Sequence, residues 1–402
     1  MNELQGKKLL VIGAGVFQIP AIKKAKELGC FVIATDGNAS APGFLYADVQ
    51  AVLDVKDVEG NLRVARQYGI DGVISIVAEL GVRTVADVAS ALNLPGLKPE
   101  VARILTNKFL MREVFAQEGL PSPLYKKIGS VEEASAASKI VGFPLVIKPV
   151  DSSGSRGVSK VDQEDDLVKA FTWAKEYSQS GDVIIESFVD GEEITVEALS
   201  YKGNHQILAI SGKKHIPFPY CVSIDLTYPP AYDKETLSQV RTVMQKTLTA
   251  LGVDSGPSHS ELLMTKTGPV LVEVAGRGGG YGVFSDIVQL VSGVDIVQES
   301  IKIALGIEPE IHPKYQKAAT LRFFAPGQGK IAAIDGVEQA RTLPGVKTLS
   351  IDLKPGDEVG AIVSDGTRPG YVITYGDTRE EAIHRADVVE QTIKFVFSKP
   401  SS

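Results

Sequence analysis

The stretch HSELLMTKTGPVLVEVAGRGGGYG, residues 259–282, decides the fold of this chain. It predicts two β-strands joined by a turn at residues 267–269, with Glu261 in the first strand and Glu273 in the second. A carboxylate in such an apolar run is costly to bury unless it is paired or bound to a metal. Carboxylates on neighbouring strands can bridge a hard cation such as Mg²⁺, whose other positions go to water and phosphate oxygens. The alternative is a surface hairpin with ordinary polar alternation.

Anion-binding features follow the second strand. Arg277 comes shortly after Glu273 and could hold a phosphate or a developing oxyanion through parallel N–H groups. The glycines at residues 278–280 precede a helix expected near Phe284, and backbone N–H groups at a helix start bind anions. We therefore expect an anion to bind beside the metal-binding strands.

Composition limits the possible classes of protein. At 402 residues, with 44% hydrophobic and 23% charged residues, the chain is globular and long enough for two or three domains. A net charge of −7 without a Lys/Arg run argues against nucleic acid as a partner. Cys30 and Cys221 are too few for a disulfide framework, which fits a reducing cytoplasm. No segment approaches 18 uninterrupted apolar residues, so no membrane span is expected.

The N-terminal residues 8–36 predict strand, helix and strand, the βαβ unit of a parallel sheet. Gly13-Ala14-Gly15 opens the helix, but Gln18 replaces the third glycine of a dinucleotide fingerprint, and Asp36 ends the second strand. Two interpretations remain: a dinucleotide site, or a tight turn that binds none. Glu79, after a later strand, is either a ligand at the sheet edge or a helix-starting carboxylate.

A lysine inside an apolar strand marks a candidate phosphate site. In FPLVIKPVDSSGSRGVSKV, Lys148 lies within the strand and residues 152–157 form a Ser/Gly loop. The lysine needs a counter-charge, and the loop can fold its backbone N–H groups around phosphate oxygens. No helix pattern follows, which separates this loop from a P-loop. Lys108, on an expected helix, could contribute to the same site or be an ordinary solvated lysine.

The segment DVIIESFVDGEEITVEALS predicts two more strands, with Glu186 ending the first and Glu193 beginning the second. Backbone donors and acceptors near residues 187–189 could pair with the edge of an adenine. Ordinary strands at the edge of a sheet have the same pattern.

Taken in order, Lys108, FPLVIKP, SSGSRG, IIESFVDGEEITVEAL, HSELL and VEVAGR resemble the ATP-grasp superfamily. The resemblance covers about residues 5–310 and is to the carboxylate–amine branch, the L-amino-acid ligase-like enzymes, which are related to carbamoyl-phosphate synthetase and phosphoribosylglycinamide synthetase. It implies an α/β ATP-grasp fold with a Rossmann-like pre-ATP-grasp domain at residues 1–100. The ATP-grasp domain would span residues 101–310, with a small lid subdomain at about 120–190. A β-rich C-terminal α+β domain would occupy residues 311–402.

The resemblance also implies ATP and Mg²⁺ as cofactors, with Mn²⁺ as an alternative ion. Lys108 and Lys148 would contact the α- and β-phosphates, Glu186 the adenine amino group and Glu193 the ribose. Glu261 and Glu273 would hold magnesium. The complete implied ATP site is Lys108, Lys148, Ser152, Ser153, Gly154, Ser155, Arg156, Gly157, Glu186, Ser187, Phe188, Val189 and Glu193. The family pattern E-x-N-x-R has asparagine where this chain has Ala275, so a second metal lacks one expected ligand.

For the catalytic residues the resemblance implies Arg277, Lys213 and His259. Lys213 lies in a Pro- and aromatic-rich segment, residues 211–235, expected as a substrate-covering loop, and His259 forms the H-x-E of amino-acid ligases. A solvated lysine and a structural histidine are the alternatives. No motif places a base beside Cys221, so it is not expected to be a nucleophile. Arg368, in a predicted hairpin turn, is the C-terminal residue that could reach the active site, although a surface position is the favoured expectation.

The implied activity is ATP-dependent activation of a carboxylate as an acyl phosphate, followed by attack of an amine and release of ADP and phosphate. Small-molecule carboxylates and amines are the expected partners, and a homodimer is a further expectation. Purine-biosynthetic enzymes acting on ribonucleotides and a carbamoyl-phosphate synthetase half-domain are alternatives. From other classes, the chain could bind nucleotide without turnover, or be an NAD(P)-dependent oxidoreductase resting on Gly13 and Gly15.

Overall fold

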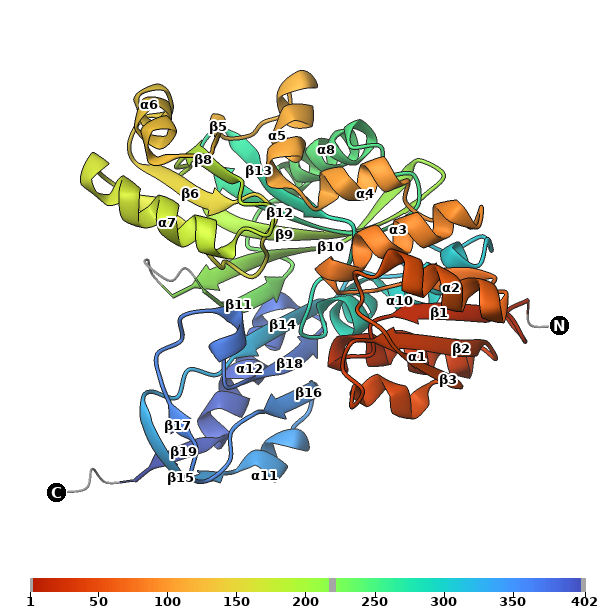
Figure 1. Cartoon of the computed structure of the whole chain (residues 1–402). Helices are drawn as coiled ribbons and strands as arrows, with labels where there is room; N and C mark the ends of the chain where they lie inside the picture. The colour runs from red at the N-terminus through yellow and green to blue at the C-terminus, as the bar shows by residue number, and fades with distance from the viewer. Residues whose placement is uncertain (1–2, 217–221, 399–402) are drawn as a thin grey trace.

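The computed structural model describes residues 3–216 and 222–398 of the chain. An N-terminal parallel sheet, a lid sheet and a long central sheet surround a common centre, and the C-terminal residues extend the central sheet (Figure 1). Cys221 and the rest of residues 217–221 lie outside the described residues, so the structure does not bear on the expectation for that cysteine.

The N-terminal domain has the predicted βαβ pattern. Its four parallel strands run in the order β3-β2-β1-β4. The strands are β1 (Lys8–Ile12), β2 (Phe31–Asp36), β3 (Val49–Val52) and β4 (Gly72–Ile74). The helices are α1 (Ile19–Glu27), α2 (Val58–Tyr68) and α3 (Val82–Ala91). Helix α2 begins where the Asp57 side chain accepts a hydrogen bond from the N–H of Gly60, which caps a free donor of the first turn.

Side chains of the protein occupy the space around the glycine turn after β1. The Asp36 carboxylate accepts the N–H of Ala14 at 2.8 Å, and Gln18 is buried with its amide oxygen 3.0 Å from the N–H of Ile76. A Cβ added at Gly43 would lie 2.6 Å from the Ala14 carbonyl oxygen. These contacts favour the interpretation of a tight structural turn over a dinucleotide site.

A separate four-stranded sheet forms the lid, in the order β5-β8-β6-β7. Its strands are β5 (Tyr125–Ile128), β6 (Leu145–Pro149), β7 (Ser159–Val161) and β8 (Val183–Ser187). Helices α6 (Val131–Val141) and α7 (Leu167–Tyr177) pack on it and enclose a hydrophobic core of its own. The lid therefore has the internal packing of an independent unit.

The central sheet contains eight strands in the order β13-β12-β9-β10-β11-β14-β18-β16. Five come from the middle of the chain: β9 (Glu192–Tyr201), β10 (Asn204–His215), β11 (Ser223–Tyr228), β12 (Gly256–Thr265) and β13 (Gly268–Ala275). The other three are β14 (Ala318–Phe323), β16 (Val346–Ile351) and β18 (Gly370–Gly376). The sheet thus continues across the expected domain boundary at residue 310, and the division into domains stays a prediction.

Helices hold the central sheet in place. They are α4 (Pro99–Leu105), α5 (Lys108–Gln117), α8 (Lys234–Ala250), α9 (Val288–Ser292) and α10 (Ile296–Ala304). Helices α4, α5 and α8 pack with strands β9, β10, β12 and β13 around one hydrophobic core. The predicted hairpin of β12 and β13 and the predicted helix that carries Lys108, α5, are present. The segment 211–235 differs from the expected loop, because residues up to His215 continue β10 and residues 223–228 form β11.

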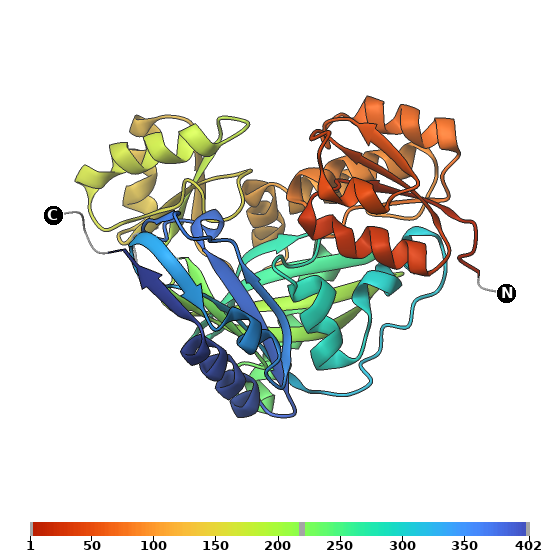
Figure 2. The same ribbon diagram turned by 90° about the horizontal axis from the view of Figure 1, so that it is seen from below.

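The C-terminal residues add a second small sheet, β17-β15-β19, beside the end of the central sheet (Figure 2). It contains β15 (Gly329–Asp335), β17 (Glu358–Val359) and β19 (Lys394–Phe397), with helices α11 (Val337–Arg341) and α12 (Arg379–Thr392). Helix α12 starts where the Thr378 hydroxyl accepts the N–H of Glu381.

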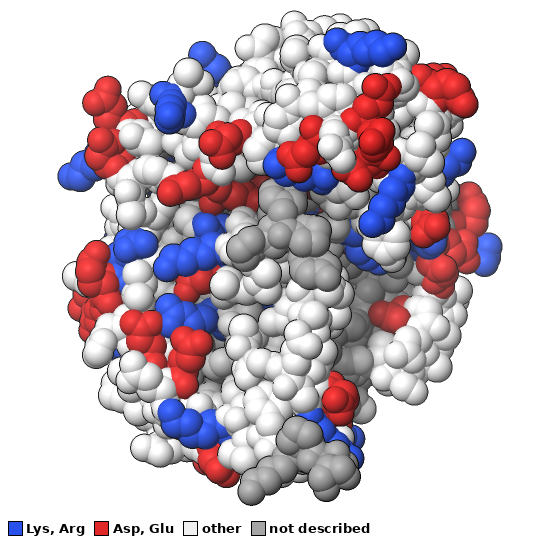
Figure 3. Space-filling model, turned by 90° about the vertical axis from the view of Figure 1, so that its left-hand side faces the viewer, with Lys and Arg blue, Asp and Glu red and all other residues white. Residues whose placement is uncertain are grey.

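On the face drawn in Figure 3, Lys and Arg side chains are interspersed with Asp and Glu. Among the described helices, none combines the length and apolarity needed to cross a membrane.

Candidate active site

A cavity of about 520 Å³ lies between the lid, the central sheet and the C-terminal strands. It brings together residues that are far apart in the sequence, and among them are all the predicted ATP-binding, metal-binding and catalytic residues except Gly157. A Cβ at Gly157 would approach Pro149 and Tyr177 at 3.0 Å, and its φ of +75° suits glycine, so this residue shapes the loop from behind.

Three charged side chains form a buried cluster at the lid end of the cavity. Lys148 lies 2.7 Å from Glu186, and Nε of Arg112 lies 2.9 Å from the other oxygen of that carboxylate. Burial lowers the pKa of Lys148, while Arg112 and Lys148 outweigh burial and lower the pKa of Glu186. Two cations against one carboxylate leave positive charge in excess, which suits an anionic ligand.

Arg112 is a site residue that was not predicted from the sequence. It follows Lys108 by one helical turn on α5, so both side chains lie on the same face, and this spacing was an available signal. Its side chain is fully buried and donates a further hydrogen bond to the Val272 carbonyl at 2.8 Å. Arg112 thereby ties the lid to the β13 strand.

Lys108 is buried, which contradicts the alternative of a solvated lysine. Its ammonium group donates to the Glu273 carboxylate at 2.8 Å and to the Ser152 carbonyl at 2.7 Å. The Asn107 side chain caps α5, which fixes Lys108 as the first helical residue. One lysine therefore links a candidate metal ligand to the start of the Ser/Gly loop.

The Ser/Gly loop turns sharply at residues with left-handed backbone. Gly154 has φ +68° and Ser155 has φ +58°. Arg156 is exposed, and its Nε donates to the Ser153 carbonyl at 3.0 Å inside the same loop. Successive turns of this kind direct backbone N–H groups to one side, as a phosphate-binding nest requires.

The β12–β13 hairpin places its carboxylates on the cavity side of the central sheet. Alternate residues of β12 are buried behind the sheet, while His259 and Glu261 line the cavity. Glu261 lies opposite Glu273 in the strand register, and His259 lies opposite Ala275. The methyl group of Ala275 thus occupies the place next to His259, where the family pattern has an amide.

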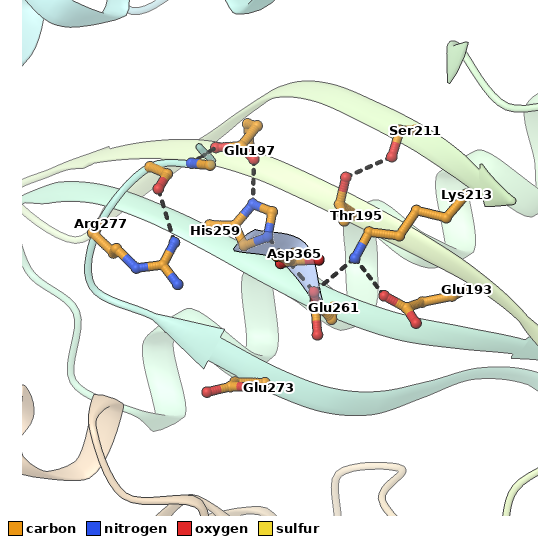
Figure 4. Close-up of polar contacts among 12 residues, drawn as sticks. Glu193, Thr195, Glu197, Ser211, Lys213, His259, Glu261, Glu273, Arg277 and Asp365 are labelled. Atoms are coloured by element: carbon orange, nitrogen blue, oxygen red, sulfur yellow. Dashed lines mark hydrogen bonds and ion pairs between the residues drawn. The ribbon is translucent and has the colours of Figure 1, made fainter. Parts of the chain in front are cut away.

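Lys213 lies in strand β10 rather than on a loop. Its ammonium group sits 2.5 Å from Glu193 and 2.7 Å from Glu261, and Figure 4 shows it between these carboxylates. Burial alone would lower the pKa of Lys213, but the two carboxylates raise it. Burial would raise the pKa of Glu261, but Lys213 and His259 hold it well below its usual range. This cluster has negative charge in excess.

His259 forms an ion pair with the fully buried Glu197, and the second oxygen of Glu197 accepts the N–H of Gly279 at 3.2 Å (Figure 4). Burial alone would lower the pKa of His259, but Glu197 and Glu261 raise it to about 9. The imidazole is therefore a cation at neutral pH. Glu197 was not predicted as a site residue either. Glu193 and Glu197 are an even number of residues apart on β9, so both side chains lie on the same face of the strand.

Arg277 also lines the cavity and is held by a carboxylate of the N-terminal domain. Its Nε donates to Glu79 at 2.7 Å, and Nη1 donates to the Gly278 carbonyl at 2.9 Å. Burial would lower the pKa of Arg277, but Glu79 raises it. The sequence offered two interpretations of Glu79, a residue at the sheet edge facing the site or a carboxylate that starts a helix. Glu79 begins a short 3₁₀ helix (Glu79–Gly81) and also contacts Arg277, so both descriptions apply.

The chemistry of the donors fits Mg²⁺. Among the described residues there is no group of three or more His, Cys, Asp and Glu side chains that could form an all-protein metal site. Mg²⁺ characteristically uses one or two carboxylates and completes its shell with water and phosphate oxygens. Glu261 and Glu273 are such a pair, and lysines now neutralise both of them.

A model of the ATP-grasp domain family matches residues 141–285, which contain Lys148, the Ser/Gly loop and both hairpin carboxylates. The chain belongs to the ATP-grasp superfamily. A second model, L-amino acid ligase C-terminal domain 2, matches residues 322–398 of this ATP-grasp protein. The predicted family and fold are thereby confirmed.

Curated relatives cover most of this ATP-grasp chain. The uncharacterized protein y4rH of Sinorhizobium fredii is 31% identical over 325 residues, which are 80% of this chain and 67% of that protein. The formate-dependent phosphoribosylglycinamide formyltransferase of Prochlorococcus marinus is 26% identical over 402 residues, 98% of each chain.

Solved structures extend the similarity to the whole fold. An L-amino acid ligase from Bacillus licheniformis superposes with a TM-score of 0.82 at 26% identity, over 98% of this chain and all of that one. A phosphoribosylglycinamide synthetase from Anaerococcus prevotii gives a TM-score of 0.79 at 20% identity, over 98% of this chain and all of that one, which shows the fold alone.

Proposed function

We propose that this chain is a C–N bond-forming ligase that activates a carboxylate with ATP as an acyl phosphate and joins it to an amine. The observation that carries the proposal is the distribution of charge along one cavity. At the lid end, the two cations Lys148 and Arg112 share the single carboxylate of Glu186. Farther along the cavity, the carboxylates of Glu193 and Glu261 share the single ammonium group of Lys213. A triphosphate suits the first region and a divalent cation suits the second.

The nucleotide would lie between the lid and the central sheet. Ser187 and Phe188 donate their N–H groups to the Leu124 and Pro144 carbonyls within the lid, so Val189 is the backbone donor we assign to the adenine edge. Glu186 would accept the adenine amino group with the capacity that its ion pairs leave free. Lys108, Lys148 and residues 152–157 would contact the phosphates.

In the first chemical step, an oxygen of the substrate carboxylate attacks the γ-phosphorus and the bond to the bridging oxygen of ADP breaks. Such a transfer depends on positioning and charge neutralisation rather than on a protein nucleophile. Mg²⁺, when bound at Glu261 and Glu273, would supply part of that neutralisation. Lys108 and Lys148 would hold the phosphates in line, and Arg277 would stabilise the charge that develops on the transferred group.

In the second step, the amine nitrogen attacks the acyl carbon, phosphate leaves and the nitrogen loses a proton. Negative charge develops on the acyl oxygen during this attack, and Arg277 and the cationic His259 line the cavity on that side. The products are the amide, ADP and phosphate, and the atoms of both substrates are accounted for.

A purine-biosynthetic activity on a ribonucleotide is the second candidate. This candidate is favoured by the similarity to formate-dependent phosphoribosylglycinamide formyltransferases, which extends over nearly the full length of both chains. The C-terminal match to L-amino acid ligases favours the first candidate.

The test is phosphate release from ATP with Mg²⁺, measured over a panel of free amino acids and purine-pathway ribonucleotides. We expect release that depends on two amino acids together, and a dipeptide detected by mass spectrometry. Release that depends on a ribonucleotide would replace the first candidate by the second. Nucleotide binding without release under any condition would contradict both.

A further inference from the structure

Arg368 lies in the cavity wall, so the favoured expectation of a surface position is wrong and the alternative, a residue that reaches the site, describes it. It follows the 3₁₀ turn η6 (Asp365–Thr367), and its side chain is only 3% exposed. The guanidinium stacks 3.6 Å from the ring centre of Phe323 and 4.4 Å from that of Tyr281. Rings on which a guanidinium stacks fix its plane and leave its edge available for bidentate recognition.

The polar contacts of Arg368 leave part of that edge free. Nε donates to the Asp365 carbonyl at 3.1 Å, and Nη1 donates to the Ser223 carbonyl at 3.0 Å and lies 3.2 Å from the Asp365 carboxylate. Among the described residues, no hydrogen-bond acceptor is bound to Nη2. Arg368 and Asp365 both line the cavity, so they present a cation and an anion side by side. The free Nη2 group can still donate to a carboxylate that carries a single charge.

Tyr281, which supports Arg368, is held in an unusual conformation. Its φ is +53°, a left-handed value that is an outlier for a bulky residue. Its hydroxyl donates to the Asp365 carbonyl at 3.0 Å, and its ring contacts Phe17 and Phe323 edge-on. Strain of this kind persists where surrounding contacts impose it, as at ligand sites. The N-terminal domain, the central region and the C-terminal strands thus meet at this one side chain.

The walls next to Arg368 are apolar. Leu226 and Leu321 lie opposite each other in the register of β11 and β14, and Val77 lies 3.9 Å from where a Cβ on Gly280 would be. The apolar residues that line this end are Phe17, Val77, Leu226, Val283, Leu321 and Phe323. This compartment differs from the lid end, where lysines, serines and glycines line the cavity.

We propose that this compartment binds the amine substrate as an α-amino acid with an apolar side chain, whose retained carboxylate lies on Arg368. The inference rests on the proposed ligase function and names its acceptor. An apolar side chain would fill the hydrophobic walls, and the amine would face Arg277, near which the acyl phosphate would form. A ribonucleotide fits less well, because apolar walls would leave ribose hydroxyls without partners, and Asp365 would repel a doubly charged phosphate.

Amino-acid amides provide the decisive probe, because L-leucinamide and L-phenylalaninamide keep the amine but lack the carboxylate. They can act only as acceptors. With ATP, Mg²⁺ and a fixed donor amino acid, we expect the wild-type chain to prefer leucine or phenylalanine over the amide roughly 10- to 100-fold in kcat/KM, as loss of a hydrogen-bonded charge predicts. L-Serine and L-aspartate should be poorer acceptors than L-leucine.

Arg368→Gln should raise KM for the amino acid by a similar factor and abolish the preference over the amide, with KM for ATP unchanged. Arg368→Lys should restore part of the preference. Arg341→Gln is the matched control, because Arg341 belongs to the same C-terminal region but donates to the Leu349 carbonyl outside the cavity lining. It should retain full discrimination.

The inference and the function can fail separately. Equal use of acid and amide by the wild-type chain would overturn the inference, and this needs no variant. Unchanged discrimination in a folded Arg368→Gln protein would do the same while amino-acid-dependent phosphate release still stood. A chain that releases phosphate only with a ribonucleotide would overturn the inference and the amino-acid ligase proposal together.

Discussion

Glu261 and Glu273 lie opposite each other across the β12–β13 hairpin, yet each carboxylate is bound by a lysine from a different element. Lys213 reaches Glu261 from β10, and Lys108 reaches Glu273 from the start of α5. These lysines neutralise carboxylates that would otherwise repel one another without a metal. When Mg·ATP binds, we therefore expect these ion pairs to separate. The two carboxylates would then contact the metal, and Lys108 would contact a phosphate.

Glu273→Gln should remove Mg²⁺-dependent turnover, because it also takes away the carboxylate partner of Lys108. Glu261→Gln should reduce turnover less severely, because Lys213 keeps Glu193 as a partner. Equilibrium binding of Mn²⁺ in the presence of ADP, followed by electron paramagnetic resonance, measures the metal site without turnover. We expect weaker Mn²⁺ binding in both variants. Mn²⁺ affinity equal to that of the wild type in Glu273→Gln would remove this residue from the metal site.

Lys148→Ala should abolish turnover and weaken ATP binding while the fold is retained. Without Lys148, Arg112 still neutralises the buried Glu186 through contacts at 2.9 and 3.1 Å, so no unpaired charge remains. Calorimetric titration with ATP and a thermal melt measure the two effects. Arg112→Met is the contrasting variant, because it removes a fully buried side chain and should lower the melting temperature. ATP affinity and rate unchanged in Lys148→Ala would contradict the phosphate assignment.

Arg277→Ala should lower kcat by roughly 10²- to 10³-fold, with ATP binding little altered, as loss of an oxyanion contact predicts. Glu79→Gln keeps the arginine but removes its charged partner at 2.7 Å, so its effect should be smaller. Steady-state kinetics with varied ATP separate kcat from KM. Loss of ATP affinity with a normal rate at saturation would assign Arg277 to nucleotide binding instead.

The His259–Glu197 pair should make stability depend on pH. The pKa of His259 rises from 6.5 to about 9 on folding, so its stabilisation is fully present below pH 6.5 and lost as pH rises through 9. The shift corresponds to at most about 3 kcal/mol. Urea unfolding of the wild type and of His259→Gln between pH 6 and pH 10 measures the difference. A difference in stability that stays constant over this range would show that the histidine is not charged.

Nucleotide should order the loop at residues 152–157. Arg156 is exposed, and its side-chain hydrogen bond to the Ser153 carbonyl stays within the loop, so trypsin should cut there in the free chain. ATP should slow that cleavage, and Lys148→Ala should remove the protection. Equal rates of cleavage with and without saturating ATP would contradict a phosphate-closing loop.

The sequence was sufficient for features that depend on neighbours in the chain. The hairpin of β12 and β13 follows from its turn and from alternating polarity. Glu261 lies opposite Glu273 because the register shifts between Glu261 and Leu262, and no local pattern predicts that shift. Arg112 and Glu186 are 74 residues apart, so no local pattern shows that they meet. A surface position was favoured for Arg368 for the same reason, because Phe323 and Tyr281 reach it only through the packing of β14 against the central region.

The continuity of the central sheet decides which part of the molecule can hinge. Strands β11 and β14 pair directly, so the metal-binding hairpin and the wall that carries Arg368 are fixed to one hydrogen-bonded frame. The lid has a sheet and core of its own, so it can move as a unit while the hairpin keeps its place in the central sheet. A chain cut at residue 310 would leave β11 as a bare edge open to pairing with other chains, so the C-terminal strands also protect the enzyme from aggregation.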